Sequence, residues 1–238
     1  MEIHCFDALP STNRAAVEAA RAGAAAFYTV MAKSQTAGRG RLSRFFHSPV
    51  GGTYFSTVLR PTLPRAQYGS ITPFAALAVR RAIAELTGVE ADVKWINDLY
   101  VGGKKICGIL AEAGEDLHGK PFVVLGIGIN TGTELPRELR AIATTVPFAD
   151  PHGLTVRILE HLQGAETAIR EGNWIEEYRA LCLWLGELVW VTQGQKTRRA
   201  KMLDVTENGA LAVEWESGER AVLCGGEISL RPAQKGEI

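Results

Sequence analysis

Two basic, glycine-containing runs constrain this chain more than any other feature of its sequence. The first, residues 35–41 (QTAGRGR), comes soon after an apolar run at residues 27–31 that is typical of a buried strand. The second, residues 94–100 (KWINDLY), lies at the end of an apparent strand, and Lys104 and Lys105 follow it. Guanidinium forks, ammonium groups and glycine backbone N–H groups suit carboxylates and phosphates. Together the runs predict a site that holds two anionic reactants side by side.

Each run alone has a simpler interpretation. A Gly-Arg-Gly-Arg loop is often a solvated turn, and Lys104 and Lys105 follow Gly102 and Gly103, as at the exposed tip of a hairpin. Because adjacent side chains of a strand point to opposite faces, only one of the two lysines can face a ligand. The combination of the two runs is more specific than either.

The order of these motifs resembles that of the biotin protein ligase family, in which a GRGRxxR loop is followed by KWPND and then by KxxG. Residues 38–44 match the loop, residues 94–98 match KWPND, and Lys105 with Gly108 matches KxxG. Two further matches, Ser11-Thr12-Asn13 near the start and GIGIN at residues 126–130, resemble the family's pattern as well. A similar small C-terminal domain extends the resemblance over nearly the whole chain.

The resemblance implies an α/β fold, with a mixed sheet of the class II aminoacyl-tRNA synthetase and biotin ligase kind, plus a C-terminal SH3-like β-barrel. The composition changes near Gly186, which predicts a catalytic domain over residues 1–185 and the barrel over residues 186–238. Hairpin-type turns at residues 208–209 and 217–218 flank an alternating run, as expected for short antiparallel strands.

Local patterns predict the elements of the first domain. Ser11 and Thr12 suit the start of a helix that Gly23 ends, and Pro73 and Gly88 bracket a second helix. Strands are expected at residues 27–31, 53–59, 93–99, 106–111 and 122–129, and further helices at residues 154–169 and 174–185.

Composition excludes several classes of partner. The chain has 26 basic and 26 acidic residues, so no global field favours DNA or a membrane surface, and no apolar run approaches a membrane span. A basic cluster at residues 196–201 is interpreted first as a solvated strand or loop and second as a contact surface. The four cysteines have neither metal-ligand nor redox spacing, so we expect buried free thiols and a cytoplasmic protein.

Longer members of the family carry an N-terminal helix-turn-helix domain that represses transcription. Only ten residues precede Ser11, so the expectation is a monofunctional ligase, a monomer or homodimer, without a DNA-binding role.

The chemistry that the resemblance implies explains the cations. Biotin is activated by ATP to biotinyl-5'-AMP and then transferred to a lysine of a biotin carboxyl carrier protein. A carboxylate must approach an α-phosphate, and fixed cations offset the repulsion between them. Removal of one such donor commonly lowers the rate by ~10²–10³. The candidates for this catalytic role are Arg39, Lys94 and Lys105.

The resemblance also assigns the remaining site residues. The family's residues that line the biotin pocket match Ser11, Thr12, Asn13 and Gln35. A loop that folds over biotin and phosphate in the family matches Arg39, Gly40 and Arg41. The residue that contacts both reactants matches Lys105. The expected biotin-binding set is Ser11, Thr12, Asn13, Gln35, Gly38, Arg39, Gly40, Arg41, Lys105, Gly108, Gly126 and Gly128. The expected nucleotide-binding set is Arg41, Phe46, Lys94, Asn97 and Asn130. No protein metal site is expected; Mg²⁺ would be held largely by the phosphates, and Asp98 could help place it or orient a lysine.

Three positions depart from the family pattern. Ile96 replaces the proline of KWPND, Leu42-Ser43 replaces a frequent Arg-Gly, and Phe46 replaces a tryptophan that can stack near the adenylate. None of these changes removes a charged group that the chemistry requires.

Two other functions are open at this stage. A lipoate protein ligase has a related catalytic fold and its own equivalent of Lys105. A non-catalytic module that senses biotin or a nucleotide is the alternative from another class, but such a module needs no lysines facing a phosphate.

Overall fold

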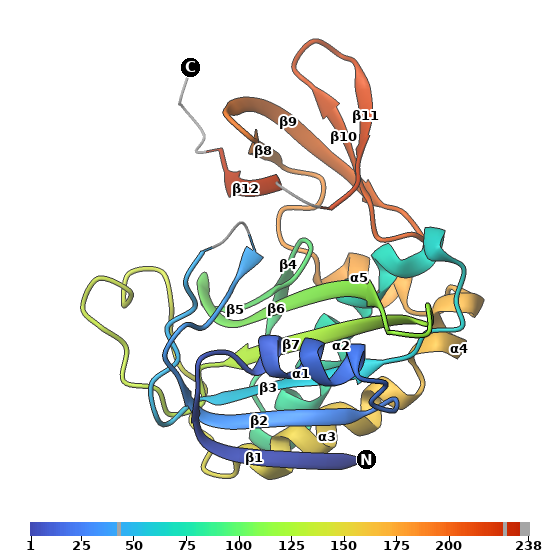
Figure 1. Cartoon of the computed structure of the whole chain (residues 1–238). Helices are drawn as coiled ribbons and strands as arrows, with labels where there is room; N and C mark the ends of the chain where they lie inside the picture. Colours follow the sequence, from blue (N-terminus) through green and yellow to red (C-terminus); the bar gives the residue numbers. More distant parts are fainter. Residues whose placement is uncertain (42–43, 226–227, 234–238) are drawn as a thin grey trace.

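The protein consists of a seven-stranded mixed sheet with helices on both faces and a five-stranded antiparallel sheet at the C-terminal end (Figure 1). This computed structural model describes residues 1–41, 44–225 and 228–233. The predicted mixed α/β class is confirmed. The positions of Leu42 and Ser43 lie outside the described residues, so the departure from the family pattern there has no structural account.

The large sheet has the strand order β1-β2-β3-β7-β6-β5-β4. Its strands are β1 (Glu2–Leu9), β2 (Tyr28–Gln35), β3 (Thr53–Leu59), β4 (Asp92–Lys94), β5 (Asp98–Val101), β6 (Lys104–Glu115) and β7 (Pro121–Ile129). Strands β1 and β2 are parallel, since a helix crosses between them, and every other neighbouring pair is antiparallel.

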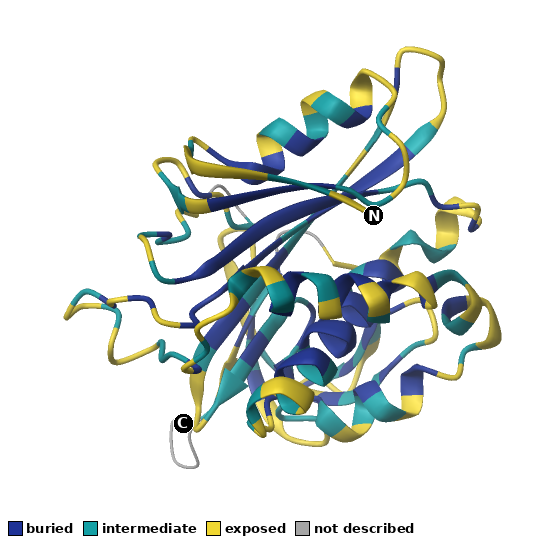
Figure 2. Ribbon diagram, turned by 90° about the horizontal axis from the view of Figure 1, so that it is seen from below, coloured by how far each residue is buried: buried dark blue, intermediate teal, exposed yellow. Residues whose placement is uncertain are grey.

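One face of the large sheet is covered by α1 (Thr12–Arg21), and the other by the remaining helices (Figure 2). The side chain of Ser11 accepts a hydrogen bond from the Arg14 N–H, as the predicted cap requires. The second layer contains a 3₁₀ helix, η2 (Arg65–Ser70), and helices α2 (Ile71–Thr87), α3 (Pro151–Gln163), α4 (Ala165–Glu171) and α5 (Ile175–Leu181). Helix α2 ends as predicted at Gly88, which is left-handed with φ 71°.

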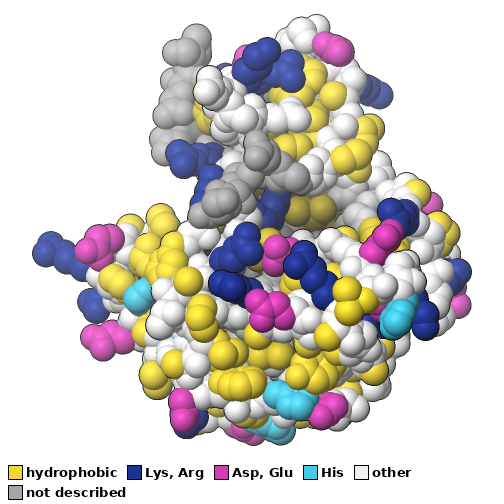
Figure 3. Space-filling model, viewed as in Figure 1, with side chains coloured by type: hydrophobic (Ala, Val, Ile, Leu, Met, Phe, Trp, Pro, Cys, Tyr) yellow, Lys and Arg dark blue, Asp and Glu magenta, His cyan; other side chains and the backbone are white. Residues whose placement is uncertain are grey.

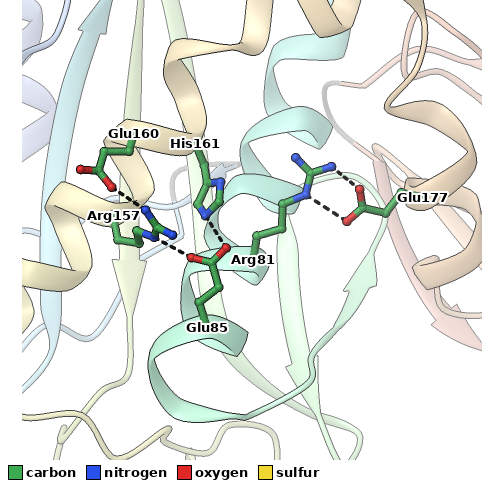
Figure 4. A network of polar contacts seen from close by, with 6 residues as sticks. All are labelled: Arg81, Glu85, Arg157, Glu160, His161 and Glu177. Atoms are coloured by element: carbon green, nitrogen blue, oxygen red, sulfur yellow. Dashed lines mark hydrogen bonds and ion pairs between the residues drawn. The ribbon is translucent and has the colours of Figure 1, made fainter.

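A network of ion pairs joins three helices of the second layer (Figure 4). Arg81 of α2 pairs with Glu177 of α5. Glu85, also on α2, accepts from Arg157 of α3 at 2.6 Å, and that hydrogen bond lowers the pKa of the Glu85 carboxyl. These side chains are partly exposed, so each pair contributes little free energy, and their main effect is on how the helices lie against one another.

The C-terminal sheet has the order β11-β10-β9-β8-β12 and is antiparallel throughout. Its strands are β8 (Leu188–Gln193), β9 (Lys196–Val205), β10 (Leu211–Trp215), β11 (Arg220–Leu223) and β12 (Ile228–Pro232). Gly209 and Gly218 take positive φ values in the two predicted turns. The basic cluster lies on β9, where Lys196, Arg198 and Lys201 are exposed, in agreement with its first interpretation.

The two sheets are fastened by the hairpin between β9 and β10. Ser70 donates to the Glu207 carbonyl at 2.9 Å, and the Trp95 indole Nε1 donates to the Gly209 carbonyl at 3.0 Å. Buried side chains from both sheets belong to one continuous apolar cluster. The domain boundary between residues 185 and 186 stays a prediction.

Several sequence-based expectations were wrong in detail. The strand expected over residues 93–99 is two strands, β4 and β5, because the chain turns through Trp95–Asn97, with a cis peptide bond between Trp95 and Ile96. The helix expected over residues 154–169 is divided at Gly164 into α3 and α4. Strand β1 was not predicted, since most of its side chains are exposed and no apolar alternation marks it.

The expectation of four buried thiols was also wrong. Cys107 and Cys182 are buried, but Cys5 and Cys224 are exposed. Cys5 lies on the edge strand β1, and Cys224 follows the edge strand β11. Edge strands leave one side of the sheet uncovered, which explains the exposure.

Candidate active site

A cavity of about 350 Å³ lies between the two sheets, within the size range of small-molecule sites. Basic side chains, with acidic ones among them, gather in the middle of this face of the molecule, below the C-terminal sheet (Figure 3). Apart from Gly38, every residue expected at the site lines the cavity: Ser11, Thr12, Asn13, Gln35, Arg39, Gly40, Arg41, Phe46, Lys94, Asn97, Lys105, Gly108, Gly126, Gly128 and Asn130.

The end of the cavity near α1 is built of buried hydrogen-bonding groups. The Thr12 N–H donates to Gln35 Oε1 at 2.8 Å, and Gln35 Nε2 donates in turn to Ser48 Oγ at 3.0 Å. Ser56 Oγ donates to Thr12 Oγ1 at 2.9 Å. These bonds fix the polar groups in place before any ligand arrives.

Asn13 supplies an acceptor that the rest of the described chain leaves unused. Its side-chain Nδ2 donates to Glu112, whereas its Oδ1 is buried and has no hydrogen-bond partner among the described residues. A buried polar atom without a partner is costly and often marks a ligand site. This oxygen can therefore accept from an N–H group of a ligand.

The glycines of β6 and β7 make room for side chains of the site itself. A Cβ at Gly126 would overlap Asn13, and one at Gly128 would lie 2.9 Å from Cζ of Phe46. At Gly108 a Cβ would meet Lys105 Nζ at 3.0 Å. A side chain at Gly126 or Gly128 would displace Asn13 or Phe46, and one at Gly108 would shift the end of Lys105.

Lys105 and Lys104 point to opposite faces, as their positions in β6 predict. Lys105 Nζ donates to Asp98 Oδ1 at 2.7 Å inside the cavity, with 29% of the lysine side chain exposed. Lys104 Nζ instead donates to the Arg140 carbonyl on the surface. Of the two roles considered for Asp98, this contact supports that of orienting a lysine.

The backbone of Lys105 is held by the connection between β7 and α3. The Lys105 N–H donates to the Ile142 carbonyl at 2.9 Å, and the Thr144 N–H donates to the Lys105 carbonyl at 3.0 Å. Asn130 donates through Nδ2 to the Thr144 carbonyl. The connection therefore forms one wall of the cavity and fixes the lysine at both sides of its peptide unit.

The described part of the glycine-arginine loop folds over the cavity and places two arginines differently. Arg41 donates to Asn97 Oδ1 at 2.7 Å and to the Ile228 carbonyl of β12 at 3.4 Å, and burial lowers the pKa of its guanidinium. Arg39 is about half exposed, and its Nη1 lies 3.7 Å from Glu112. Arg41 thus bridges the two sheets, while Arg39 faces the open side.

Lys94 stands at the end of β4, where its Nζ donates to Tyr100 Oη at 3.3 Å. Burial lowers the pKa of this ammonium, and the neighbouring charges of Lys105, Arg231 and Arg44 act in the same direction. Asp98 opposes them. The cavity therefore gathers cations whose mutual repulsion an anionic ligand would relieve.

Gly38 does not line the cavity. It lies behind the loop, where its carbonyl accepts from the Phe46 N–H and an added Cβ would lie 2.7 Å from Ser48 Oγ. These contacts shape the loop, and the expected role of Gly38 in binding biotin stays a prediction.

Sequence analysis did not single out several cavity-lining residues as site residues. Tyr100 lies within the second basic run, and the spacing of Leu135, Leu139 and Ile142 in a polar connection was a usable signal for an apolar wall. Residues 228–230 of β12 also line the cavity. They come from the opposite end of the chain, and no local pattern connects them to the site.

In the described ranges, no group of three or more His, Cys, Asp or Glu side chains is arranged to hold a metal ion. The same ranges contain no helix that is both long and apolar enough to span a membrane.

The fold and the site define a protein of the biotin protein ligase structural class. The structure of a biotin protein ligase from Aquifex aeolicus in complex with biotin and ATP matches with a TM-score of 0.82 and 27% identity, over 98% of this chain and 99% of that one. The predicted fold is thereby confirmed. A model of the Biotin/lipoate A/B protein ligase family matches residues 6–130.

Sequence relatives agree with the structural match. A biotin--[acetyl-CoA-carboxylase] ligase of Mycobacterium tuberculosis is 32% identical over 92% of this chain and 85% of its own length. The bifunctional ligase/repressor BirA of Bacillus subtilis is 42% identical over 147 residues, and this match spans 45% of that relative. The chain belongs to the Biotin/lipoate A/B protein ligase family.

Proposed function

We propose that this protein is a biotin protein ligase, which activates biotin with ATP to biotinyl-5'-AMP and transfers the biotinyl group to a lysine of a biotin carboxyl carrier protein. The observation that carries the proposal is one cavity with two unlike ends. One end holds hydroxyl and amide groups, including Asn13 Oδ1, which has no partner among the described residues, and the other holds Lys94, Lys105 and Arg41.

The first step needs the cationic end. A carboxylate oxygen of biotin attacks the α-phosphorus of ATP, a P–O bond forms, and the bond to the departing pyrophosphate breaks. Charge builds on the phosphate oxygens, and preorganised cations in a site shielded from water stabilise it strongly. Lys105 lies on the floor of the cavity and is assigned to the carboxylate and α-phosphate, while Lys94 is assigned to the phosphates.

In the second step a neutral lysine amine of the carrier attacks the acyl carbon of the adenylate. An amide bond forms, the bond to AMP breaks, and the amine loses a proton. The intermediate is a mixed anhydride that water would destroy, so the loop that carries Arg39 and Arg41 is assigned to covering it.

The polar end favours biotin over lipoate. The ureido ring of biotin offers two N–H donors and a carbonyl acceptor, which match the amide and hydroxyl groups of Asn13, Thr12 and Ser56. The dithiolane ring of lipoate has no N–H group and would leave the buried Asn13 Oδ1 without a hydrogen-bond donor, which is costly. The named activity of the Mycobacterium tuberculosis relative agrees with this preference.

Mg²⁺ enters the proposal only as an ion carried by the ATP phosphates. Asp98, the carboxylate considered for it, is paired with Lys105. The carrier protein as acceptor and a cytoplasmic location are likewise parts of the proposal.

Pyrophosphate release tests the function directly. The protein is mixed with MgATP and either biotin, lipoate or no acid, and release is followed in time. We expect pyrophosphate release only in the mixture that contains biotin and MgATP. Release with lipoate would favour the lipoate ligase, and binding of biotin without any release would favour a non-catalytic module.

A further inference from the structure

The ammonium of Lys94 lies close to two aromatic side chains. Its Nζ lies 5.3 Å from the ring centroid of Tyr100 and 5.3 Å from that of Trp184. The Tyr100 hydroxyl also accepts a hydrogen bond from it. The carboxylate of Asp98 nearby is already bound to Lys105 at 2.7 Å.

The backbone brings Trp184 to this place from the segment between α5 and β8. The Leu183 N–H donates to the Val93 carbonyl at 2.8 Å, and Cys182 forms a parallel bridge with the same residue. The segment is therefore fastened beside the residue that precedes Lys94. Trp184 has φ 66°, a conformation that side-chain-bearing residues rarely adopt, and Glu187 N–H donates to its carbonyl.

Aromatic rings hold a cation in a way that suits phosphate binding. The negative ring faces attract the ammonium without neutralising it and without using its hydrogen-bond donors fully. A carboxylate would hold the lysine more firmly but would compete with the phosphate for the same charge. The rings also restrict the long, flexible lysine side chain to few rotamers before ATP arrives. Less conformational entropy is then lost when ATP binds.

We propose that Trp184 is a positioning residue, which together with Tyr100 forms an aromatic clamp that aims Lys94 at the phosphates of ATP. This proposal rests on the proposed ligase function. The clamp acts through Lys94 and touches no reacting atom itself, so its removal should matter for ATP and not for biotin.

Replacement of the ring tests the clamp. Trp184→Leu keeps apolar bulk and removes the ring, and Trp184→Phe keeps a ring at the same backbone conformation. With pyrophosphate release as the assay, we expect Trp184→Leu to lower kcat/KM for ATP about tenfold, the scale of one desolvated cation–π contact, with KM for biotin unchanged. Trp184→Phe should recover most of the loss.

A double-mutant cycle separates positioning from general destabilisation. In a Lys94→Ala background, Trp184→Leu should change the rate less than about twofold, since the group it positions is gone. A merely structural role of Trp184 would cause the same loss in both backgrounds, and that result would overturn the proposal. Unaltered kcat/KM for ATP in Trp184→Leu would overturn it as well.

Two further arms keep the outcome decisive. If Trp184→Leu does not fold, Tyr100→Leu removes the other ring together with its hydroxyl acceptor and should show the same dependence on Lys94, while full activity of that variant would contradict the clamp. Wild-type protein without any pyrophosphate release would overturn the ligase function and the clamp with it. An active wild type with an insensitive Trp184 would overturn the clamp alone.

Discussion

Lys105 and Asp98 face each other across strands β6 and β5, with 2.7 Å between Nζ and Oδ1. Their side chains are 29% and 18% exposed, so water screens the pair only in part. The pair holds the ammonium in the cavity, yet a carboxylate or phosphate that arrives must share or replace the bond to Asp98. Orientation without full neutralisation suits the role proposed for Lys105, which is to contact two oxyanions.

Lys105→Ala should lose adenylate formation by at least ~10²-fold, because it removes one preorganised donor from the developing charge. Lys104→Ala is the matched control and should be nearly silent, since Lys104 points to the surface and bonds the Arg140 carbonyl. Pyrophosphate release measured for both variants decides the matter. An inactive Lys104→Ala beside an active Lys105→Ala would show that the assignment of the catalytic lysine is wrong.

Asp98→Asn should slow adenylate formation roughly tenfold or more, the scale of one hydrogen bond to a charged group. The amide has the same shape but holds the Lys105 ammonium less firmly. Asp92→Asn, at an exposed position of β4, is the control and should leave the rate unchanged. If raised Mg²⁺ fully restored Asp98→Asn, the carboxylate would act on the metal instead of the lysine.

Arg39→Ala and Arg41→Ala should both release biotinyl-AMP from the site, which would then modify exposed lysines of a bystander protein. Arg41 should show the larger effect, because it bonds Asn97 and β12 while Arg39 is half exposed. Retention of radiolabelled adenylate on gel filtration measures the effect. Arg14→Ala, on the outer face of α1, should retain the adenylate as wild type does; equal retention by all three variants would show that the loop is not the cover.

Gly126→Ala should weaken biotin binding about tenfold, since the new Cβ displaces Asn13 and one hydrogen bond is lost. Gly164→Ala is the control, because a Cβ there meets nothing within 4 Å and its φ is −84°. Calorimetry with biotin alone gives the Kd. An unchanged Kd for biotin in Gly126→Ala would show that Asn13 does not bind biotin.

As the pH is raised, the rate of adenylate formation should begin to fall at a lower pH than it would if Lys94 had the pKa of an ordinary lysine. Burial lowers the pKa of Lys94 below 10.5, and a lysine carries its charge only below its pKa. The charge is therefore lost at a lower pH than usual. Lys94→Arg should move the fall to higher pH, since arginine stays protonated above about pH 12; identical pH profiles for the two proteins would contradict a role for the Lys94 charge.

Local patterns predicted many of the helices and strands, whereas the family resemblance supplied the class of fold and the candidate site residues, most of which line one cavity. The cap at Ser11, the glycine after α2 and the alternation in β6 act within a few residues, so they could be found without the structure. Strand β1 was not predicted from the sequence, because an exposed edge strand shows no regular alternation of apolar and polar residues. The division between β4 and β5 depends on a turn at Trp95, whose indole is held by Gly209 from the other sheet.

The same reason explains what was missed in the site. Trp184 reaches Lys94 only because the segment after α5 is hydrogen-bonded to β4, and the wall from β12 depends on how the two sheets meet. Contacts between distant segments are set by tertiary packing, which no periodicity of a single segment records.

The placement of β12 has a consequence for how the protein is made. Residues 228–230 come after every other described residue that lines the cavity, and the Ile228 carbonyl accepts a hydrogen bond from Arg41 of the loop over the cavity. During synthesis, which adds residues in order from the N-terminus, the motifs near α1 emerge long before this strand. A nascent polypeptide, or one cut before Ile228, therefore has its polar and cationic groups without their last wall. If the protein is the ligase proposed above, a reactive acyl adenylate can be confined only after residues 228–230 have been added and have taken their place beside the cavity.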